Sequence, residues 1–288
     1  MTKFAVLMCP LLLTSLPTKL SGVTVDVIVV VDESGSMAGE HAWLPGMITS
    51  LNSALTGLGY DTRFGLYGFG NGLSGGANSG RELLDAGTAA AFGTAAVSLV
   101  TSGGTEDGYA GLNFALNNYS FTSGSIVNYI LVTDEDRDNT NVALTFAGMQ
   151  AALGASLLNA VVDNPFSCAA GTALGVDSTS TGYRANGSGG FTSCASGTVG
   201  NGAGTTEADY VALAHALGGA GWDLNQLRAG GLTADSFTAA FVNIKVQEIQ
   251  QQDPGSSAVP EPGTLLLSSA ALGALLAFRR VRPFQTNR

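Results

Sequence analysis

The chain has 288 residues, of which 12% are charged and 45% are hydrophobic, and it contains 40 glycines. This composition excludes a disordered protein, because enough apolar residues are present to build a core. The formal net charge is −10, and the middle of the chain, counted without its two basic ends, carries about −15. An acidic surface repels phosphate backbones, so we expect no nucleic acid partner.

The first 22 residues are predicted to be a secretory signal peptide. Lys3 gives the positive start, and residues 4–13 form an apolar stretch of signal-peptide length. We interpret Cys9 as part of this leader and not as a lipidated residue. Lysine is scarce, and Ala, Ser, Thr and Asn are plentiful. Together these features are typical of an exported bacterial surface protein.

Residues 23–31 are predicted to be a buried strand, because 27–31 are an unbroken Val/Ile run. Asp32, Ser34 and Ser36 follow it directly, and Gly35 allows a sharp turn between them. In parallel sheets, ligand sites lie at the carboxyl ends of the strands. The sequence therefore places one carboxylate and two hydroxyls where binding takes place.

Further along the chain, strands alternate with helices. We expect strands at 63–69, 82–84, 127–132 and 157–162, and helices at 41–58, 89–100, 107–119 and 141–153, with a Gly/Ser/Asn loop at 71–80. Such alternation predicts an α/β protein with a Rossmann-like, doubly wound and mostly parallel sheet that has helices on both faces.

Two more polar positions follow predicted elements of this sheet. Thr105 ends the Gly-rich loop 101–105, and Asp134 comes directly after the strand 127–132. Hydroxyl and carboxylate oxygens from three loops on one edge suit a hard divalent cation. The alternative is that these are ordinary turn and capping residues, which are common after strands.

With these three segments in order, the chain resembles von Willebrand factor type A (vWA) domains that carry a metal-ion-dependent adhesion site. The resemblance covers residues 23–252 and implies a metal set of Asp32, Ser34, Ser36, Thr105 and Asp134. It implies Mg²⁺ as the cation, with Mn²⁺ or Ca²⁺ as alternatives. It also implies that an acidic group on the partner, a protein or an acidic polysaccharide, completes the coordination.

Residues 164–204 interrupt the alternation and are predicted to be an insertion. The segment is rich in Gly, Ser and Thr and contains Cys168 and Cys194, the only cysteines outside the leader. In an exported protein such a pair indicates a disulfide, which would close a loop of about 25 residues and contribute roughly 3 kcal/mol. A metal pair or two free thiols are the alternatives. The insertion is either a partner-binding loop or a solvated flap.

After the insertion the alternation resumes. We expect a short helix at 209–217, a strand at 222–227 and a closing helix at 235–250. A linker at 253–263 then leads to the end of the chain.

The C-terminal segment is predicted to be an anchor. Residues 264–278 are apolar, and three arginines follow within 279–282. As a helix the apolar part would be about 22 Å long, marginal for a bilayer core of roughly 30 Å. With Pro260, Glu261 and Pro262 before it, the tail resembles a PEP-CTERM sorting signal. That resemblance implies recognition by an exosortase-type membrane protease, and attachment to the cell envelope or release outside the cell.

We expect no enzyme. A serine nucleophile needs a positioned base, and the chain has only His41 and His215, both expected to be structural. Asp136 and Asp138 are interpreted as solvated loop acids. The alternatives to metal-bridged adhesion are a structural envelope protein whose metal only stabilises its loops and, with less support, a metal-dependent hydrolase.

Overall fold

The computed structural model describes residues 22–70 and 80–255. The signal peptide, the linker's sorting motif Pro260–Glu261–Pro262, the apolar tail and most of the loop predicted at 71–80 lie outside the described residues and stay predictions. The chain divides into two units after Ile249, and the first unit contains the sheet and nearly all of the helices. Within the described ranges, no helix has the length and apolarity needed to cross a bilayer.

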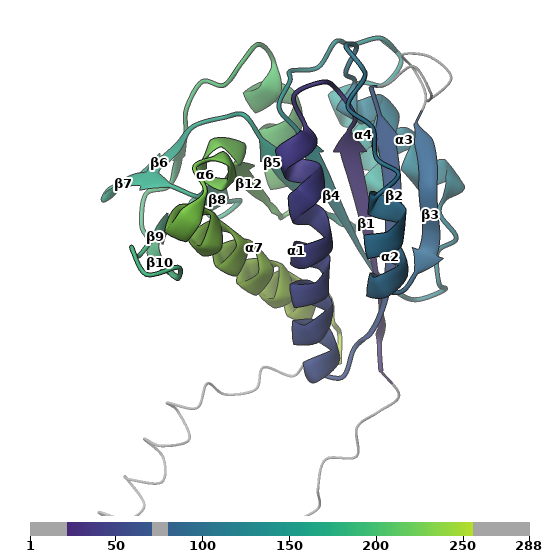
Figure 1. Ribbon diagram of the computed structural model, residues 1–288, viewed down its shortest axis with the longest axis horizontal. Coiled ribbons are helices and arrows are strands. Elements are labelled where there is room, and N and C mark those ends of the chain that lie inside the picture. Colours follow the sequence, from purple (N-terminus) through teal and green to yellow (C-terminus); the bar gives the residue numbers. More distant parts are fainter. Residues whose placement is uncertain (1–21, 71–79, 256–288) are drawn as a thin grey trace, which may run out of the picture. The chain divides into compact units, whose positions relative to one another are not determined.

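A nine-stranded sheet forms the centre of the fold (Figure 1). Its strands lie in the order β10-β9-β8-β12-β5-β4-β1-β2-β3. The pairs joining β2, β1, β4, β5 and β12 are parallel, whereas β3 and the strands β8, β9 and β10 pair antiparallel. The bounds are β1 Thr24–Asp32, β2 Asp61–Phe69, β3 Arg81–Gly87, β4 Ile126–Thr133, β5 Leu157–Val162, β8 Gly175–Asp177, β9 Gly182–Ala185, β10 Phe191–Cys194 and β12 Ala220–Asp223.

Helices cover both faces of the sheet, because its central strands are apolar on both sides. In β1, Val27 and Val29 pack into the core on one face, and Ile28 and Val30 pack into the core on the other. The first face is covered by α1 Ala38–Gly57, α2 Ala89–Ala96 and α7 Gly231–Gln252, and the second by α3 Gly108–Asn118, α4 Phe146–Leu153, the π-helical turn η1 Glu207–Val211 and α5 Ala212–Ala216. The predicted fold class is confirmed.

The predicted strand at 222–227 is only partly correct. β12 ends at Asp223, and residues Leu224–Arg228 form the short helix α6. The change occurs at Asp223 because its side chain caps the helix, accepting a hydrogen bond of 3.0 Å from the backbone N–H of Asn225. Likewise α4 begins at Phe146 and not near 141, since Thr145 caps it.

The insertion is ordered structure and not a flap. It contains β8, β9 and β10 of the main sheet and a separate three-stranded sheet made of β6 Phe166–Cys168, β7 Gly171–Ala173 and β11 Thr198–Val199. The predicted disulfide joins Cys168 of β6 to Cys194 of β10. The bond therefore ties the edge strand of the large sheet to the small one.

Candidate metal centre

The candidate centre lies where the sheet changes its winding direction. β1 sits between β2 and β4, and the strand order β3-β2-β1-β4-β5-β12 places successive connections on opposite sides of it. Ligands of doubly wound sheets bind at the carboxyl ends of strands at such a point. Asp32 is the last residue of β1, and Asp134 follows Thr133, the last residue of β4. The fold thus brings the two predicted acids to one place.

Asp32 is completely buried at the base of the centre. Its Oδ1 accepts a hydrogen bond of 2.7 Å from the backbone N–H of Ser34, and its Oδ2 accepts one of 2.9 Å from the hydroxyl of Thr133. Burial raises the pKa of Asp32 to about 7, and the nearby charge of Asp134 adds to this rise. Negative charge is therefore in surplus here.

The two serines lie together above Asp32. Their hydroxyl oxygens are 3.3 Å apart. Ser34 pairs with Gly103 in an isolated parallel bridge, and the N–H of Ser102 donates to the backbone oxygen of Glu33 at 3.0 Å. These contacts bring the Gly-rich loop alongside the Asp32–Ser36 turn, as the sequence predicted.

Thr105 reaches the centre through the same loop, with its side chain exposed. A Cβ placed on Gly70 would lie 3.0 Å from Asp32 Oδ1 and 3.6 Å from the backbone oxygen of Thr105. Gly70 has a φ of +82°, which favours glycine. Glycine therefore keeps open a space that any other residue would fill, between the Asp32 carboxylate and the Thr105 loop.

Asp134 is held on one oxygen only. Its Oδ2 accepts a hydrogen bond of 2.7 Å from Arg228, while its Oδ1 is buried and has no hydrogen-bond partner among the described residues. The same guanidinium pairs with Glu40 at 2.6 Å and donates to the backbone oxygen of Ser36 at 3.4 Å. Arg228 lies just after the strand predicted at 222–227, and the sequence did not single it out.

These observations fit a divalent cation. Ser34 and Ser36 lie beside Asp32, and the Gly-rich loop that leads to Thr105 borders them. An Asp134 oxygen lacks a hydrogen-bond partner among the described residues, and burial disfavours the charge on Asp32. In the part of the chain that the structure describes, no group of three His, Cys, Asp or Glu residues could hold a metal. A cation here would consequently depend on the hydroxyls of Ser34, Ser36 and Thr105 beside the two acids, a hard oxygen set suited to Mg²⁺, Mn²⁺ or Ca²⁺.

Glu106 is a further acidic neighbour that the sequence did not single out. It is 6% exposed, and burial, together with the charges of Asp32 and Asp138, raises its pKa to about 7. Its backbone N–H donates to Asp138 Oδ2 at 2.7 Å, and the Asp138 N–H donates back to the Glu106 oxygen at 2.9 Å. Asp138 is exposed, as expected of a solvated loop acid, and it also links two loops of the centre.

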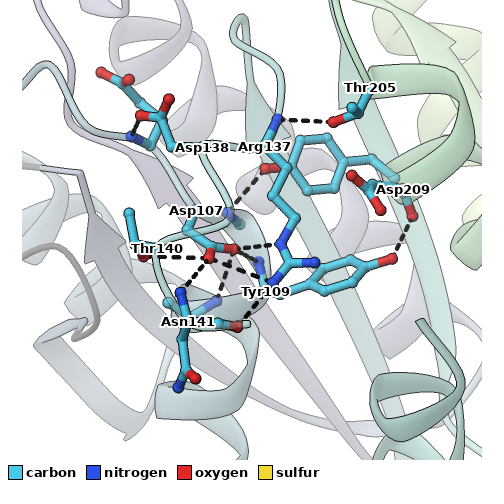
Figure 2. Close-up of polar contacts among 12 residues, drawn as sticks. Asp107, Tyr109, Arg137, Asp138, Thr140, Asn141, Thr205 and Asp209 are labelled. Carbon is cyan, nitrogen blue, oxygen red and sulfur yellow. Dashed lines mark hydrogen bonds and ion pairs between the residues drawn. The ribbon is translucent and has the colours of Figure 1, made fainter. Parts of the chain in front are cut away.

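A second network fixes the start of α3 and with it the loop of Thr105 (Figure 2). Asp107 Oδ1 accepts hydrogen bonds from the N–H groups of Tyr109 at 3.1 Å and Ala110 at 3.4 Å, and from Arg137 Nε at 2.8 Å. The Arg137 guanidinium also lies 4.1 Å from the centre of the Tyr109 ring. Asp107 is 1% exposed, so its ion pair with Arg137 is shielded from water.

The segment after the insertion joins the same network. Thr205 accepts a hydrogen bond of 3.3 Å from the backbone N–H of Arg137, as Figure 2 shows. Its own N–H donates to Asp136 Oδ2 at 3.2 Å. Asp136 is thus also a structural acceptor and not simply a solvated acid.

Both histidines make hydrogen bonds to the backbone. His41 Nε2 lies 2.7 Å from the backbone oxygen of Asp32, and His215 Nε2 lies 3.0 Å from that of Val176. These contacts agree with the structural roles expected for them, and the His41 contact also steadies the end of β1.

No family model and no curated protein matches the chain. It is similar to an aerotolerance-related membrane protein from Bacteroides fragilis, with 16% identity, a TM-score of 0.45 and coverage of 78% of this chain and 99% of that one. It is also similar to the pilus adhesin SpaC from Lactobacillus rhamnosus GG in its open conformation, with 31% identity, a TM-score of 0.33 and coverage of 41% of this chain and 15% of that one. A third similar structure is a von Willebrand factor type A protein from Catenulispora acidiphila, with 20% identity, a TM-score of 0.37 and coverage of 49% of this chain and 33% of that one. The chain spans less than two thirds of the length of the latter two.

Proposed function

We propose that this chain is an exported vWA-type surface protein that binds a partner through a divalent cation held by Asp32, Ser34, Ser36, Thr105 and Asp134. One observation carries the proposal: Asp32 and Asp134 follow neighbouring strands at the switch point of the sheet, and a buried Asp134 oxygen has no hydrogen-bond partner among the described residues. The motif order in the sequence supports the same assignment.

The chemistry of the donors supports binding rather than catalysis. When bound, a divalent cation supplies a Lewis-acidic position for an oxygen ligand. The five residues would supply five oxygen donors, so a six-coordinate cation would have a position left for one more oxygen ligand. An outside carboxylate, on a protein or an acidic polysaccharide, is the ligand that completes such a set. The proposed role is therefore adhesion without turnover.

The proposal extends to the two ends of the chain. The leader would direct export, and the tail with Pro260, Glu261 and Pro262 would be recognised by an exosortase-type protease at the cell envelope. Both rest on sequence alone.

Calorimetric titration of Mg²⁺, Mn²⁺ and Ca²⁺ into the full chain tests the metal centre. We expect saturable binding that disappears in Asp32→Ala, with circular dichroism confirming that the variant folds. Asp26→Asn is the matched control, because Asp26 is also fully buried on β1 but near its opposite end. Absence of cation binding in the folded wild-type chain would contradict the proposal.

The partner step needs a separate measurement. Binding of the chain to immobilised acidic polysaccharide or to carboxylate-bearing protein should require the cation and be lost in EDTA. Binding that persists in EDTA would contradict a metal bridge. A cation that raises the melting temperature without supporting any association would instead favour the structural alternative.

A further inference from the structure

A second polar cluster lies deep in the core, away from the candidate metal centre. It comprises Asn159 of β5, Trp222 of β12, and Lys245 and Glu248 of α7. Asn159, Trp222 and Lys245 are completely buried, and Glu248 is 7% exposed. A lysine without any exposed surface is rare unless its amine has a specific role or partner.

One carboxylate oxygen connects the amine and the amide. Glu248 Oε2 accepts a hydrogen bond of 2.8 Å from Asn159 Nδ2 and one of 3.2 Å from Lys245 Nζ. The second carboxylate oxygen, Oε1, is buried and has no hydrogen-bond partner within the described residues. The two nitrogens, held on the same oxygen, are therefore close neighbours across the helix–sheet interface.

The amide of Asn159 is held on its other side as well. Its Oδ1 accepts a hydrogen bond of 2.8 Å from the indole N–H of Trp222. This bond draws electron density away from the amide carbon and is placed to stabilise negative charge that develops on Oδ1. The Trp222 ring is itself packed against Tyr183, Phe237 and Phe241, so water is kept away from the amide.

Burial also prepares the amine. Desolvation lowers the pKa of Lys245, although the charge of Glu248 opposes the shift. A lysine that gives up its proton in an apolar site is a nucleophile. Glu248 is the group placed to take that proton, and a buried ion pair that becomes neutral escapes the cost of two desolvated charges.

We infer that Lys245 and Asn159 form an intramolecular amide cross-link, with Glu248 as the acid–base group. The Lys245 Nζ–Asn159 Cγ bond forms, and the Cγ–Nδ2 bond of Asn159 breaks. Two protons leave the ammonium group: one moves through Glu248 to Nδ2, which departs as ammonia, and the other remains on the Glu248 carboxyl. No electrons are exchanged, and no group from outside the chain is required.

Intact mass of the full chain, unfolded and reduced, tests the inference directly. We expect a mass lower than the sequence requires by one ammonia, after any removal of the leader or tail is taken into account. Glu248→Gln is the matched variant, since it keeps both reacting groups but lacks the proton acceptor. Its mass should show no such loss.

Peptide mapping locates the bond. Trypsin should fail to cut after Lys245, and the peptide 138–184 should be recovered joined to one that contains Lys245. An asparagine elsewhere that forms a succinimide with its own backbone also loses ammonia. That reaction gives no branched peptide, and its mass loss would persist in Lys245→Met. A folded wild-type chain with its full mass, or with the two peptides separate, would overturn the inference whatever the variants do.

Discussion

Arg228 and Asp134 form an ion pair with a distance of 2.7 Å between Nη2 and Oδ2, and the same guanidinium pairs with Glu40. A basic side chain from α6 thus already holds one of the proposed metal ligands. A cation entering the centre competes with Arg228 for Asp134, so this arginine is expected to set the affinity of the centre.

Arg228→Gln should raise the affinity for Mn²⁺ by about tenfold, which corresponds to about 1.4 kcal/mol. The physical reason is that a positive charge is removed beside the cation and Asp134 is released. Without metal, the same variant should be less stable by about 1–3 kcal/mol, because Glu40 and Asp134 lose their partner. Calorimetry and urea unfolding measure the two effects. Arg63→Gln is the control, since Arg63 pairs with Asp26 near the opposite end of β1. An unchanged affinity would mean that Arg228 does not compete.

Asp107→Ala should destabilise the chain by about 3–5 kcal/mol, because it leaves Arg137 buried without its carboxylate. It should also weaken cation binding, since the start of α3 no longer fixes the loop of Thr105. Asp107→Asn keeps an oxygen for the cap but not the charge, and we expect an intermediate loss. Urea unfolding and calorimetry on all three proteins check the order. Equal cation affinities in the wild-type protein and both variants would show that the Asp107 network does not influence the metal centre.

Replacing both cysteines, Cys168→Ser with Cys194→Ser, should lower the unfolding free energy by about 3 kcal/mol, because a long loop of the unfolded chain is no longer closed. Cation affinity should be unchanged, since the disulfide lies in the insertion and not at the switch point. Denaturant unfolding of the reduced and oxidised wild-type protein provides the control. A loss of metal binding in the double variant would show that the insertion supports the centre.

Acid should weaken the insertion through Asp177. Burial alone would raise the pKa of this carboxyl, but hydrogen bonds from Tyr183, Thr179 and the backbone of Thr181 outweigh burial and lower it. A lowered pKa in the folded state contributes stability above the ordinary value, and that stability is lost as the pH falls through the folded value. Tyr183→Phe keeps the ring and removes one bond of 2.6 Å.

The variant should therefore be less stable than wild type by about 1 kcal/mol at pH 6. The difference should be smaller at pH 3 than at pH 6, because acid moves the carboxyl toward its protonated form, in which its hydrogen bonds contribute less. Urea unfolding at the two pH values measures this, and a difference that grows with acidity would contradict the assignment.

The sheet was predictable where strands were long and apolar. The strand predicted at 157–162 matches β5, because five of its six residues are apolar and helices cover both faces of the sheet. The strands of the insertion were not predictable, since residues such as Gly182 and Thr198 carry no alternating apolar pattern. Their pairing comes from contacts distant in sequence, which a local pattern does not contain.

The candidate ligands could be named from motif order, but their surroundings could not. Arg228 lies 94 residues after Asp134, and no local signal links the two. Glu106 and Asp107 stand next to the predicted Thr105, yet only the structure shows that one is a buried acid near Asp32 and the other a helix cap holding Arg137. Motif spacing predicts the oxygen donors, whereas only the fold shows which charged side chains lie next to them.

The position of Glu248 has a mechanical consequence. It lies in the last turns of α7, the final helix of the described residues, which packs on one face of the sheet. A pulling force on the C-terminal end of α7 would reach the side-chain contact with Asn159 early, before it could peel the rest of the helix away. Because Asn159 belongs to a central parallel strand, the load would pass directly into the middle of the sheet.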